Sequence, residues 1–166
     1  MESISNIKDI FNNTPENKLQ MFIEQYKDDS RQGVANLVKR AAKKIDDYNK
    51  EIERTYKLSE FERKYSDYEF ICGIDEVGRG PLAGPVVAGA VILPKDCDIL
   101  YINDSKKLSA KKREDLYEVI MEKAVCAKTA VVSPKVIDEI NILQATYEAM
   151  RQAISNVRTT ANITSK

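Results

Sequence analysis

The amino-acid sequence predicts a mixed α/β fold that is preceded by a helical N-terminal region. Five of the six glycines lie between residues 73 and 89, and four of the five prolines follow residue 70. The spacing of apolar residues also changes from helical to strand-like at about residue 70. Because glycine and proline interrupt helices, the first seventy residues favour continuous helix and the remainder favours alternating strands, turns and helices.

Three helical segments are predicted in the N-terminal region, which we expect to span 1–68. Apolar residues recur there at spacings of three and four, as one buried helix face requires. Thr14-Pro15 predicts the start of the second helix, because proline is well tolerated at the first helical position. The three apolar stripes consist of Ile4, Ile7, Ile10 and Phe11, then Leu19, Phe22, Ile23 and Tyr26, then Val34, Leu37, Val38, Ala41, Ile45, Tyr48 and Ile52.

The third of these helices is moderately basic. Residues 31–64 contain ten basic and six acidic residues. Two interpretations stay open, a solvated helix face and a surface that binds nucleic acid. The sequence alone favours the solvated face.

Strands and helices alternate after residue 70. FICGIDEVG, at 70–78, predicts a strand that ends in a turn, and PVVAGAVIL, at 85–93, predicts a second strand. A helix capped by Ser109 and a third strand at 128–132 follow. Ser133-Pro134 opens a short helix, and a further amphipathic helix has its apolar stripe at Leu143, Tyr147, Met150 and Ile154. We expect 158–166 to be a disordered tail, because it is polar and lacks periodicity.

The composition excludes several kinds of chemistry. The 166 residues carry 26 basic and 26 acidic side chains, so the chain as a whole is not a strongly basic nucleic-acid-binding protein. The absence of histidine excludes Ser-His-Asp catalysis, Cys-His catalysis and imidazole zinc sites. Three widely separated cysteines predict reduced thiols. Because there is no signal-peptide pattern and no apolar run of about 20 residues, we expect a cytoplasmic protein with no membrane partner.

Two adjacent acids, Asp75 and Glu76, stand at the end of the first predicted strand. Side chains alternate between the two faces of a strand, but a following glycine turn can relax this rule and let the two carboxylates converge. Converging carboxylates suit Mg²⁺ or Mn²⁺, which prefer oxygen ligands. The alternative is an exposed strand end with ordinary solvated acids.

The turn that follows, Gly78-Arg79-Gly80, suits the binding of an anion or a hydroxyl group. Glycines let backbone N–H groups approach a ligand closely, and the Arg79 guanidinium matches a phosphate. Gly78, Gly80 and Ala83 also fit the G-x-G-x-x-G/A dinucleotide fingerprint, which requires a helix directly after Gly80. The prolines and the VVAGAVI run that follow predict a strand instead.

A second cluster of polar residues, DSKKLS at 104–109, precedes a predicted helix. Its hydroxyl and amine groups suit contact with a phosphate backbone. The alternative is a solvated helix cap with scattered lysines, which this cluster taken alone favours.

Taken together, GIDEVGRGPLAGPVVAGAVIL, NDSKKLSAKKRE and VIDEINILQATYEAM closely resemble the motifs of bacterial ribonuclease HII, from about Phe70 to about Val157. The resemblance implies a ribonuclease-H-like mixed sheet with flanking helices at 69–157, incomplete at its C-terminus, with 1–68 as a helical extension. It implies cleavage of the RNA strand of RNA–DNA hybrids, and of single ribonucleotides in duplex DNA. The implied reaction is two-metal-ion hydrolysis that leaves a 5′-phosphate and a 3′-hydroxyl. The related ribonuclease HIII has Thr where Arg79 stands.

The same resemblance assigns roles to individual residues. It makes Asp75 and Glu76 catalytic residues and ligands of a divalent metal, Mn²⁺ or Mg²⁺. Three further residues form the turn that reads the ribose 2′-hydroxyl, and two lie against substrate phosphates. These substrate-binding residues are Gly78, Arg79 and Gly80 in the turn, and Ser105 and Lys106 at the phosphates.

The sequence departs from the family pattern after Asn156. The family continues with a strand that carries a third catalytic aspartate, then a fourth aspartate and a tyrosine that packs on the sugar, and VRTTANITSK does not resemble that stretch. Asp115, Asp138 and Glu139 sit in other motifs and are not expected to replace those acids. We therefore expect a C-terminally truncated monomer with little or no activity alone. The alternative is a non-catalytic nucleic-acid-binding fragment.

Overall fold

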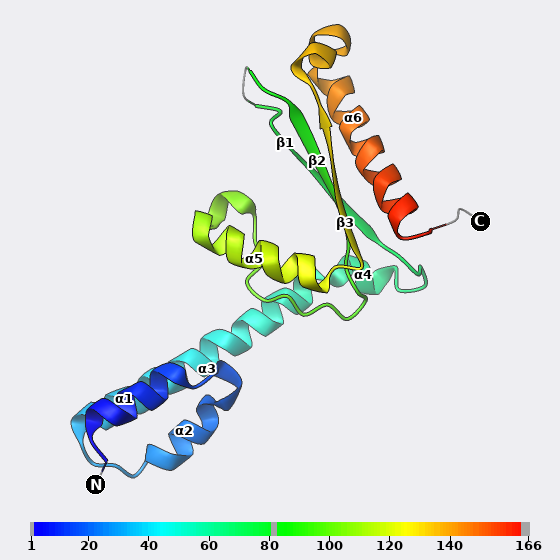
Figure 1. The fold of residues 1–166 in the computed structure, drawn as a ribbon. Coiled ribbons are helices and arrows are strands. Elements are labelled where there is room, and N and C mark those ends of the chain that lie inside the picture. Colours follow the sequence, from blue (N-terminus) through cyan, green and yellow to red (C-terminus); the bar gives the residue numbers. More distant parts are fainter. Residues whose placement is uncertain (1, 81–82, 164–166) are drawn as a thin grey trace. The chain divides into compact units, whose positions relative to one another are not determined.

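The computed structural model describes residues 2–80 and 83–163 (Figure 1). The chain forms two compact units, residues 1–58 and residues 59–166. None of the described helices is long and apolar enough to cross a membrane.

The first unit consists of helices. They are α1 (Ile4–Asn13), the short 3₁₀ helix η1 (Glu16–Lys18), α2 (Leu19–Tyr26) and α3 (Gln32–Leu58). Ser3 caps α1, because its hydroxyl accepts a hydrogen bond from the backbone N–H of Asn6 at 3.2 Å. This unit confirms the predicted helical N-terminal region.

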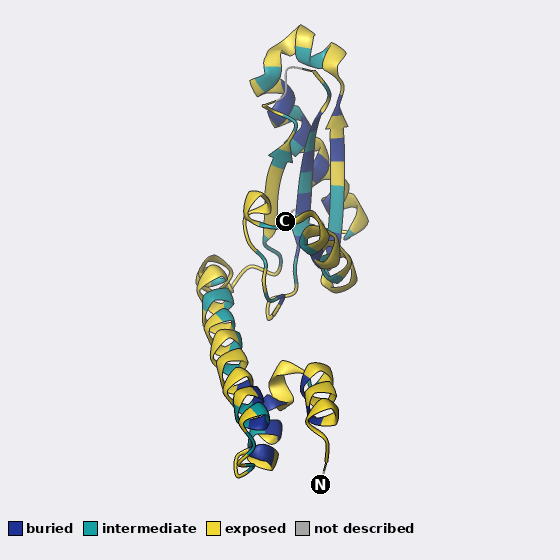
Figure 2. Ribbon diagram, turned by 90° about the vertical axis from the view of Figure 1, so that its left-hand side faces the viewer, coloured by how far each residue is buried: buried dark blue, intermediate teal, exposed yellow. Residues whose placement is uncertain are grey.

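The core of the first unit lies where α1 and α2 pack on the beginning of α3. The aromatic rings of Phe11 and Phe22 meet there with centroids 5.6 Å apart. The buried residues are Ile7, Phe11, Leu19, Phe22, Tyr26, Val34, Leu37 and Ala41. No described residue of α3 after Ala41 is fully buried, and Figure 2 shows the rest of this helix as largely exposed.

The second unit is a three-stranded antiparallel sheet with helices. Its helices are α4 (Glu60–Lys64), the 3₁₀ helix η2 (Ser105–Lys107), α5 (Ala110–Lys123) and α6 (Pro134–Thr160). The strands β1 (Cys72–Val77), β2 (Val86–Ile92) and β3 (Cys126–Val132) lie in the order β1-β2-β3. The predicted mixed α/β fold is therefore confirmed.

Helix α6 covers one face of the sheet, along which it runs in Figure 1. Burial alternates strictly along β2, which is what a strand with one covered face requires. The residues buried between sheet and helix are Val86, Ala88, Ala90, Ile92, Cys126, Ala130, Val132, Ala145, Ala149, Ala153 and Val157. On the opposite face Val131 is 59% exposed, so this face is much less covered.

Helix α6 is interrupted at Asn141, whose φ of 69° and ψ of 162° are not helical. The Asn141 side chain accepts hydrogen bonds from the backbone N–H groups of Leu143 and Gln144, both at 3.1 Å, and so caps the helix that restarts there. This break corresponds to the predicted change from a short helix to a longer one.

The face of α6 that packs on the sheet differs from the predicted apolar stripe. Leu143, Tyr147 and Ile154 are 41%, 47% and 39% exposed, and Met150 is only partly buried. The buried face consists instead of Ala145, Thr146, Ala149, Ala153 and Val157. Small side chains are favoured here because the facing positions of β2 include the buried Ala88 and Ala90, which leave a close approach between helix and sheet.

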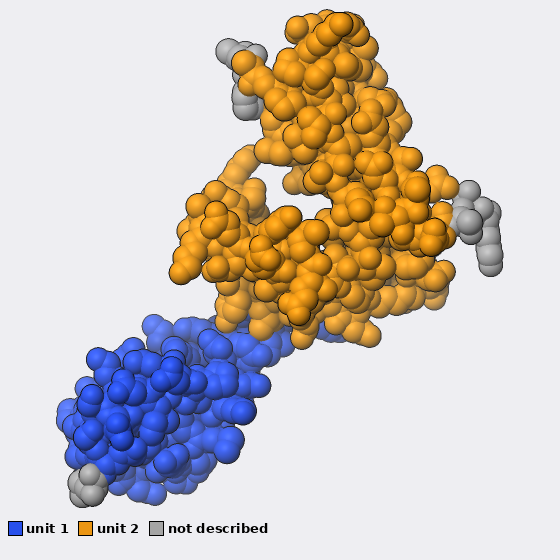
Figure 3. Space-filling view, in the orientation of Figure 1, with its two compact units in different colours: residues 1–58 blue, residues 59–166 orange. Residues whose placement is uncertain are grey.

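The chain divides between its units after residue 58, where α3 ends, and α4 belongs to the second unit (Figure 3). The sequence predicts a domain boundary at residue 68, and this boundary stays a prediction. At the other end, α6 continues through Thr160, into the segment predicted to be a disordered tail. Its last turn is closed by hydrogen bonds such as that from the Ala161 N–H to the Val157 carbonyl at 2.9 Å. Residues 164–166 of that predicted tail lie outside the described residues.

Candidate functional site

The two adjacent acids lie in the last part of β1, on opposite faces of the sheet. Asp75 pairs with Gly89 of β2, and Glu76 pairs with Ala88. Directly paired residues of an antiparallel sheet share a face, so Glu76 lies on the face covered by α6 and Asp75 on the other. The expectation that these carboxylates converge is therefore wrong for this structure. Regular pairing holds β1 through Val77, so the glycine turn comes too late to change the alternation.

The two acids also differ in their contacts. One carboxylate oxygen of Glu76 lies 3.6 Å from Nη1 of Arg79, and the Glu76 side chain is 22% exposed. Asp75 is exposed, and its Oδ1 accepts a hydrogen bond from the backbone N–H of Glu76 at 2.9 Å. Its cross-strand neighbour Gly89 has open space where a side chain would stand. The Asp75 side chain thus faces solvent, whereas the Glu76 carboxylate lies beside the Arg79 guanidinium.

Gly78 and Gly80 of the turn have different surroundings. Gly78 has a φ of +91°, and a Cβ atom there would overlap the carbonyl oxygen of Pro85. Only glycine fits both constraints. At Gly80 an added Cβ atom would meet nothing within 4 Å. The turn therefore requires the first glycine, whereas a side chain at the second would meet no described atom within 4 Å.

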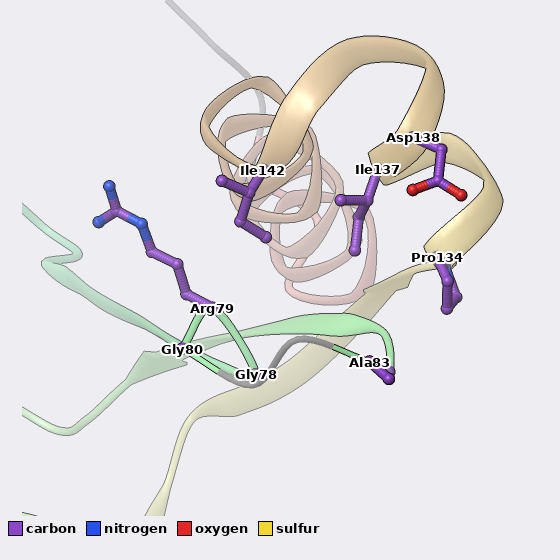
Figure 4. Close-up of a pocket in the computed structure, with 9 residues that line it drawn as sticks. Gly78, Arg79, Gly80, Ala83, Pro134, Ile137, Asp138 and Ile142 are labelled. Carbon is purple, nitrogen blue, oxygen red and sulfur yellow. The ribbon is translucent and has the colours of Figure 1, made fainter.

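The turn forms one wall of an open pocket of about 240 Å³. The other wall is the beginning of α6, which contributes Pro134, Ile137, Asp138 and Ile142 (Figure 4). In Figure 4 the guanidinium of Arg79 and the carboxylate of Asp138 lie on opposite sides, with the two isoleucines between them. The pocket therefore offers glycine backbone, a cation, an anion and an apolar wall.

Sequence reasoning missed the contribution of α6 to this pocket and set Asp138 aside. The contribution depends on the pairing of Val86 with Val132, which brings the start of α6 beside the turn that precedes β2. That register cannot be read from the sequence, because an antiparallel partner strand can slide by two residues and keep its buried face.

Ser105 and Lys106 lie in a loop of their own and do not line this pocket. Asp104 caps η2 by accepting a hydrogen bond from the backbone N–H of Lys106 at 2.9 Å. Arg113 donates to the carbonyl of Ser105 at 3.1 Å and to that of Leu108 at 2.6 Å. The loop is fixed by these bonds, and the sequence-predicted phosphate contacts stay predictions.

The described residues do not bring three or more carboxylate or thiol donors together for a divalent ion. Over residues 2–80 and 83–163, no three acidic or cysteine side chains come together as a metal-binding group. Asp75 and Glu76 lie on opposite faces of the sheet and do not form one donor set in this structure. The arrangement seen here therefore does not fit the metal that the family resemblance implies.

The structure does not support the interpretation of Gly78, Gly80 and Ala83 as a dinucleotide-binding fingerprint. Pro81 and Leu82 lie outside the described residues, and the chain that follows them leads into β2 at Val86. No helix follows Gly80 in the part of the chain that the structure describes, so the condition for this fingerprint is not met there.

Comparison with known proteins identifies the relatives of both units. A family model described as ribonuclease HII N-terminal domain matches residues 3–66, and one described as ribonuclease HII matches residues 72–164. The ribonuclease HII of Lachnoclostridium phytofermentans is 58% identical over 134 residues, which are 81% of this chain and 53% of that protein. The ribonuclease HII of Clostridioides difficile is 46% identical over 156 residues, 93% of this chain and 61% of the relative.

A third relative agrees with these two. The ribonuclease HII of Bacillus subtilis is 47% identical over 141 residues, which are 84% of this chain and 55% of that protein. The chain thus spans between about half and three fifths of the length of the curated relatives that it matches.

Proposed function

The chain belongs to the ribonuclease HII family, and we propose that it carries the ribose-reading part of an endonuclease that cleaves the RNA strand of RNA–DNA hybrids. Its substrates would include duplex DNA with a single embedded ribonucleotide, cut to leave a 5′-phosphate and a 3′-hydroxyl. We propose that it acts in the cytoplasm as a monomer. The observation that carries the proposal is the turn at 78–80: Gly78 must be glycine, a side chain at Gly80 would meet no described atom within 4 Å, and the half-exposed Arg79 lies beside Glu76.

The chemistry of this turn supports the reading of ribose. A 2′-hydroxyl group marks a ribonucleotide within DNA, and it both donates and accepts hydrogen bonds. Backbone groups at Gly80 can approach it closely, because glycine has no side chain of its own and no described atom lies within 4 Å of where one would stand. Arg79 is 52% exposed and lies near Glu76, which favours an orientation from which its guanidinium can bind an adjacent phosphate. Ser105 and Lys106 would add phosphate contacts from their own loop.

We propose that this chain alone cleaves little or no substrate. The family resemblance implies a divalent ion, Mg²⁺ or Mn²⁺, but Asp75 and Glu76 lie on opposite faces and do not form one donor set. We therefore assign no reaction step to the ion. In this proposal the residues of this chain bind and orient the substrate. Asp75 is the exposed carboxylate nearest to the 78–80 turn in sequence.

The alternative is a nucleic-acid-binding fragment with no catalytic role, which the separation of the two acids favours. The two hypotheses differ in selectivity. A part that reads ribose must distinguish a duplex with one ribonucleotide from the same duplex made entirely of DNA. A fragment that contacts only phosphates binds both equally.

A binding experiment with a matched control tests the proposal. Arg79 and Arg151 are both exposed arginines that lie near a glutamate three residues earlier in the chain, Glu76 and Glu148. We expect the wild-type chain to prefer the ribonucleotide-containing duplex, and Arg79→Ala to weaken binding to it by about tenfold, as for loss of a charged hydrogen bond. Arg151→Ala should bind like the wild type. Equal affinity of the wild type for both duplexes would refute the ribose-reading proposal.

A cleavage assay on the same duplex with Mg²⁺ or Mn²⁺ tests the activity. We expect little or no product from the 166-residue chain. Robust cutting that disappears in Asp75→Asn would overturn the prediction that this chain alone is inactive.

A further inference from the structure

The first half of α3 carries four exposed cations that the proposed function does not use. We call Lys39, Arg40, Lys43 and Lys44 the α3 cationic face. Residues 30–45 contain five basic side chains and no acidic one. The four cations form two pairs at i,i+4 spacing, 39 with 43 and 40 with 44, and like charges at this spacing repel and weaken a helix. The arrangement is unfavourable for folding alone, which points to a binding role.

The second half of the same helix is built in the opposite way. Lys57 pairs with Glu53 at 2.8 Å, Arg54 pairs with Glu51 at 2.7 Å, and Lys50 pairs with Asp46. Each of these cations is neutralised within its own helix. None of the four residues of the α3 cationic face has an ion pair with any acid in the described chain. Their charges are therefore available to an anion from outside.

A buried aromatic ring positions two of the cations. Cζ of Arg40 lies 5.0 Å from the centroid of the Phe11 ring, and Nζ of Lys44 lies 4.8 Å from the same centroid. Phe11 has no exposed surface, so the ring is fixed in the core. The attraction between the two cations and the ring restricts the positions of the Arg40 and Lys44 side chains before a ligand binds. These side chains therefore lose less conformational entropy on binding.

We propose that the α3 cationic face binds the phosphate backbone of duplex nucleic acid, independently of base sequence and of ribose. This inference takes its partner class from the proposed function but places the contact in the other unit of the chain. At a rise of about 1.5 Å per residue the face spans about 7–8 Å, the length of about two phosphates of one strand. A regular row of phosphates therefore matches the two pairs of cations.

A lipid surface fits this part of the helix less well. Amphipathic helices that bind membranes insert an apolar face beside their basic one. Here Val34, Leu37 and Ala41 are buried against α1 and α2 and are not available for insertion. The face is therefore suited to a rigid polyanion that lies along it.

The test compares two pairs of lysines on the same helix. Lys39/Lys43→Gln and Lys50/Lys57→Gln each remove two exposed positive charges from α3, and glutamine keeps the helix propensity high. The probe is an all-DNA duplex in buffer with a chelator, with affinity measured by fluorescence anisotropy over a range of salt concentrations. We expect Lys39/Lys43→Gln to weaken binding by about tenfold at low salt and to reduce the slope of log K against log salt by about two. Lys50/Lys57→Gln should leave the slope unchanged.

Several outcomes decide the inference. Equal losses in both double variants, or no loss in Lys39/Lys43→Gln, would overturn it. Tighter binding to vesicles that contain phosphatidylserine than to DNA would overturn the assignment to nucleic acid. Recovery of the affinity in Lys39/Lys43→Arg would show that charge, rather than altered folding, causes the loss.

The same measurements separate this inference from the proposed function. Suppose that the wild-type chain prefers the ribonucleotide-containing duplex, but Lys39/Lys43→Gln does not change the affinity for DNA. This result would refute the inference on the α3 cationic face and leave the ribose-reading proposal standing. Suppose instead that Lys39/Lys43→Gln weakens salt-dependent binding to DNA, but the wild-type chain shows no preference for a ribonucleotide. This result would refute only the ribose-reading proposal.

Discussion

Gly78 and Gly80 are only two residues apart, yet the structure requires glycine at one of them alone. The positive φ of Gly78 and its approach to the Pro85 carbonyl exclude any side chain. Gly80 has room for a methyl group. If the 78–80 turn reads ribose as proposed, the second glycine is kept for the ligand rather than for the fold.

Replacing each glycine with alanine separates these two roles. We expect Gly78→Ala to lower the free energy of unfolding of its unit by at least about 1–3 kcal/mol, because a non-glycine residue is strained there and its Cβ atom would also overlap the Pro85 carbonyl oxygen. We expect Gly80→Ala to change it by less than about 0.5 kcal/mol, while weakening binding to a ribonucleotide-containing duplex. Urea denaturation and anisotropy on the same samples measure both effects. A Gly80→Ala protein that is stable and binds normally would contradict the assigned role.

The sequence could predict the residue types of this site but not their orientation. Two acids after an apolar segment predict a strand end with carboxylates, and the glycines predict a turn. Whether Asp75 and Glu76 meet depends on how far β1 stays paired with β2, and the pairing extends to Val77. Asp138 enters the pocket through the pairing of β2 with β3, a contact between distant parts of the chain that no local pattern encodes.

Helix α6 shows why periodicity alone can select the wrong face. Large apolar residues dominate a hydrophobic pattern, so Leu143, Tyr147 and Ile154 define its apparent stripe. Burial on a sheet also depends on how closely helix and sheet approach. The alanines of α6 permit a close approach because they face alanines of β2.

A single enlarged side chain distinguishes the two faces of α6. Ala149 has no exposed surface, and we expect Ala149→Leu to destabilise the second unit by about 1–3 kcal/mol through overpacking. Leu143→Ala, on the more exposed face, should cost less than about 1 kcal/mol. Denaturant unfolding followed by circular dichroism measures both. The reverse ranking would mean that the predicted stripe is the packed face after all.

At the scale of the whole molecule, the described residues form two separate hydrophobic cores. One consists of residues from α1, α2 and α3, and the other of residues from β2, β3 and α6. The change in composition near residue 70 predicted two kinds of structure. It could not locate the end of α3 at Leu58, because the residues after it are as polar and charged as the helix surface before it.

Because the two units have separate hydrophobic cores, we expect each unit to unfold in its own transition. Leu19 is fully buried in the first core, and Ile92 is 1% exposed in the second. Truncation of either residue to alanine should cost about 2–5 kcal/mol, which corresponds to a fall of about 10 °C or more in the midpoint of a small unit. Differential scanning calorimetry should therefore show two transitions. Leu19→Ala should lower one of them, and Ile92→Ala should lower the other.

The pattern of these two shifts decides how the units are coupled. Each core draws its residues from its own unit, so the loss of one buried side chain should leave the other transition in place. If both variants lowered a single common transition by similar amounts, the units would unfold as one cooperative body. Under the first outcome, the α3 cationic face and the 78–80 turn can be varied independently, because damage to one unit does not unfold the other.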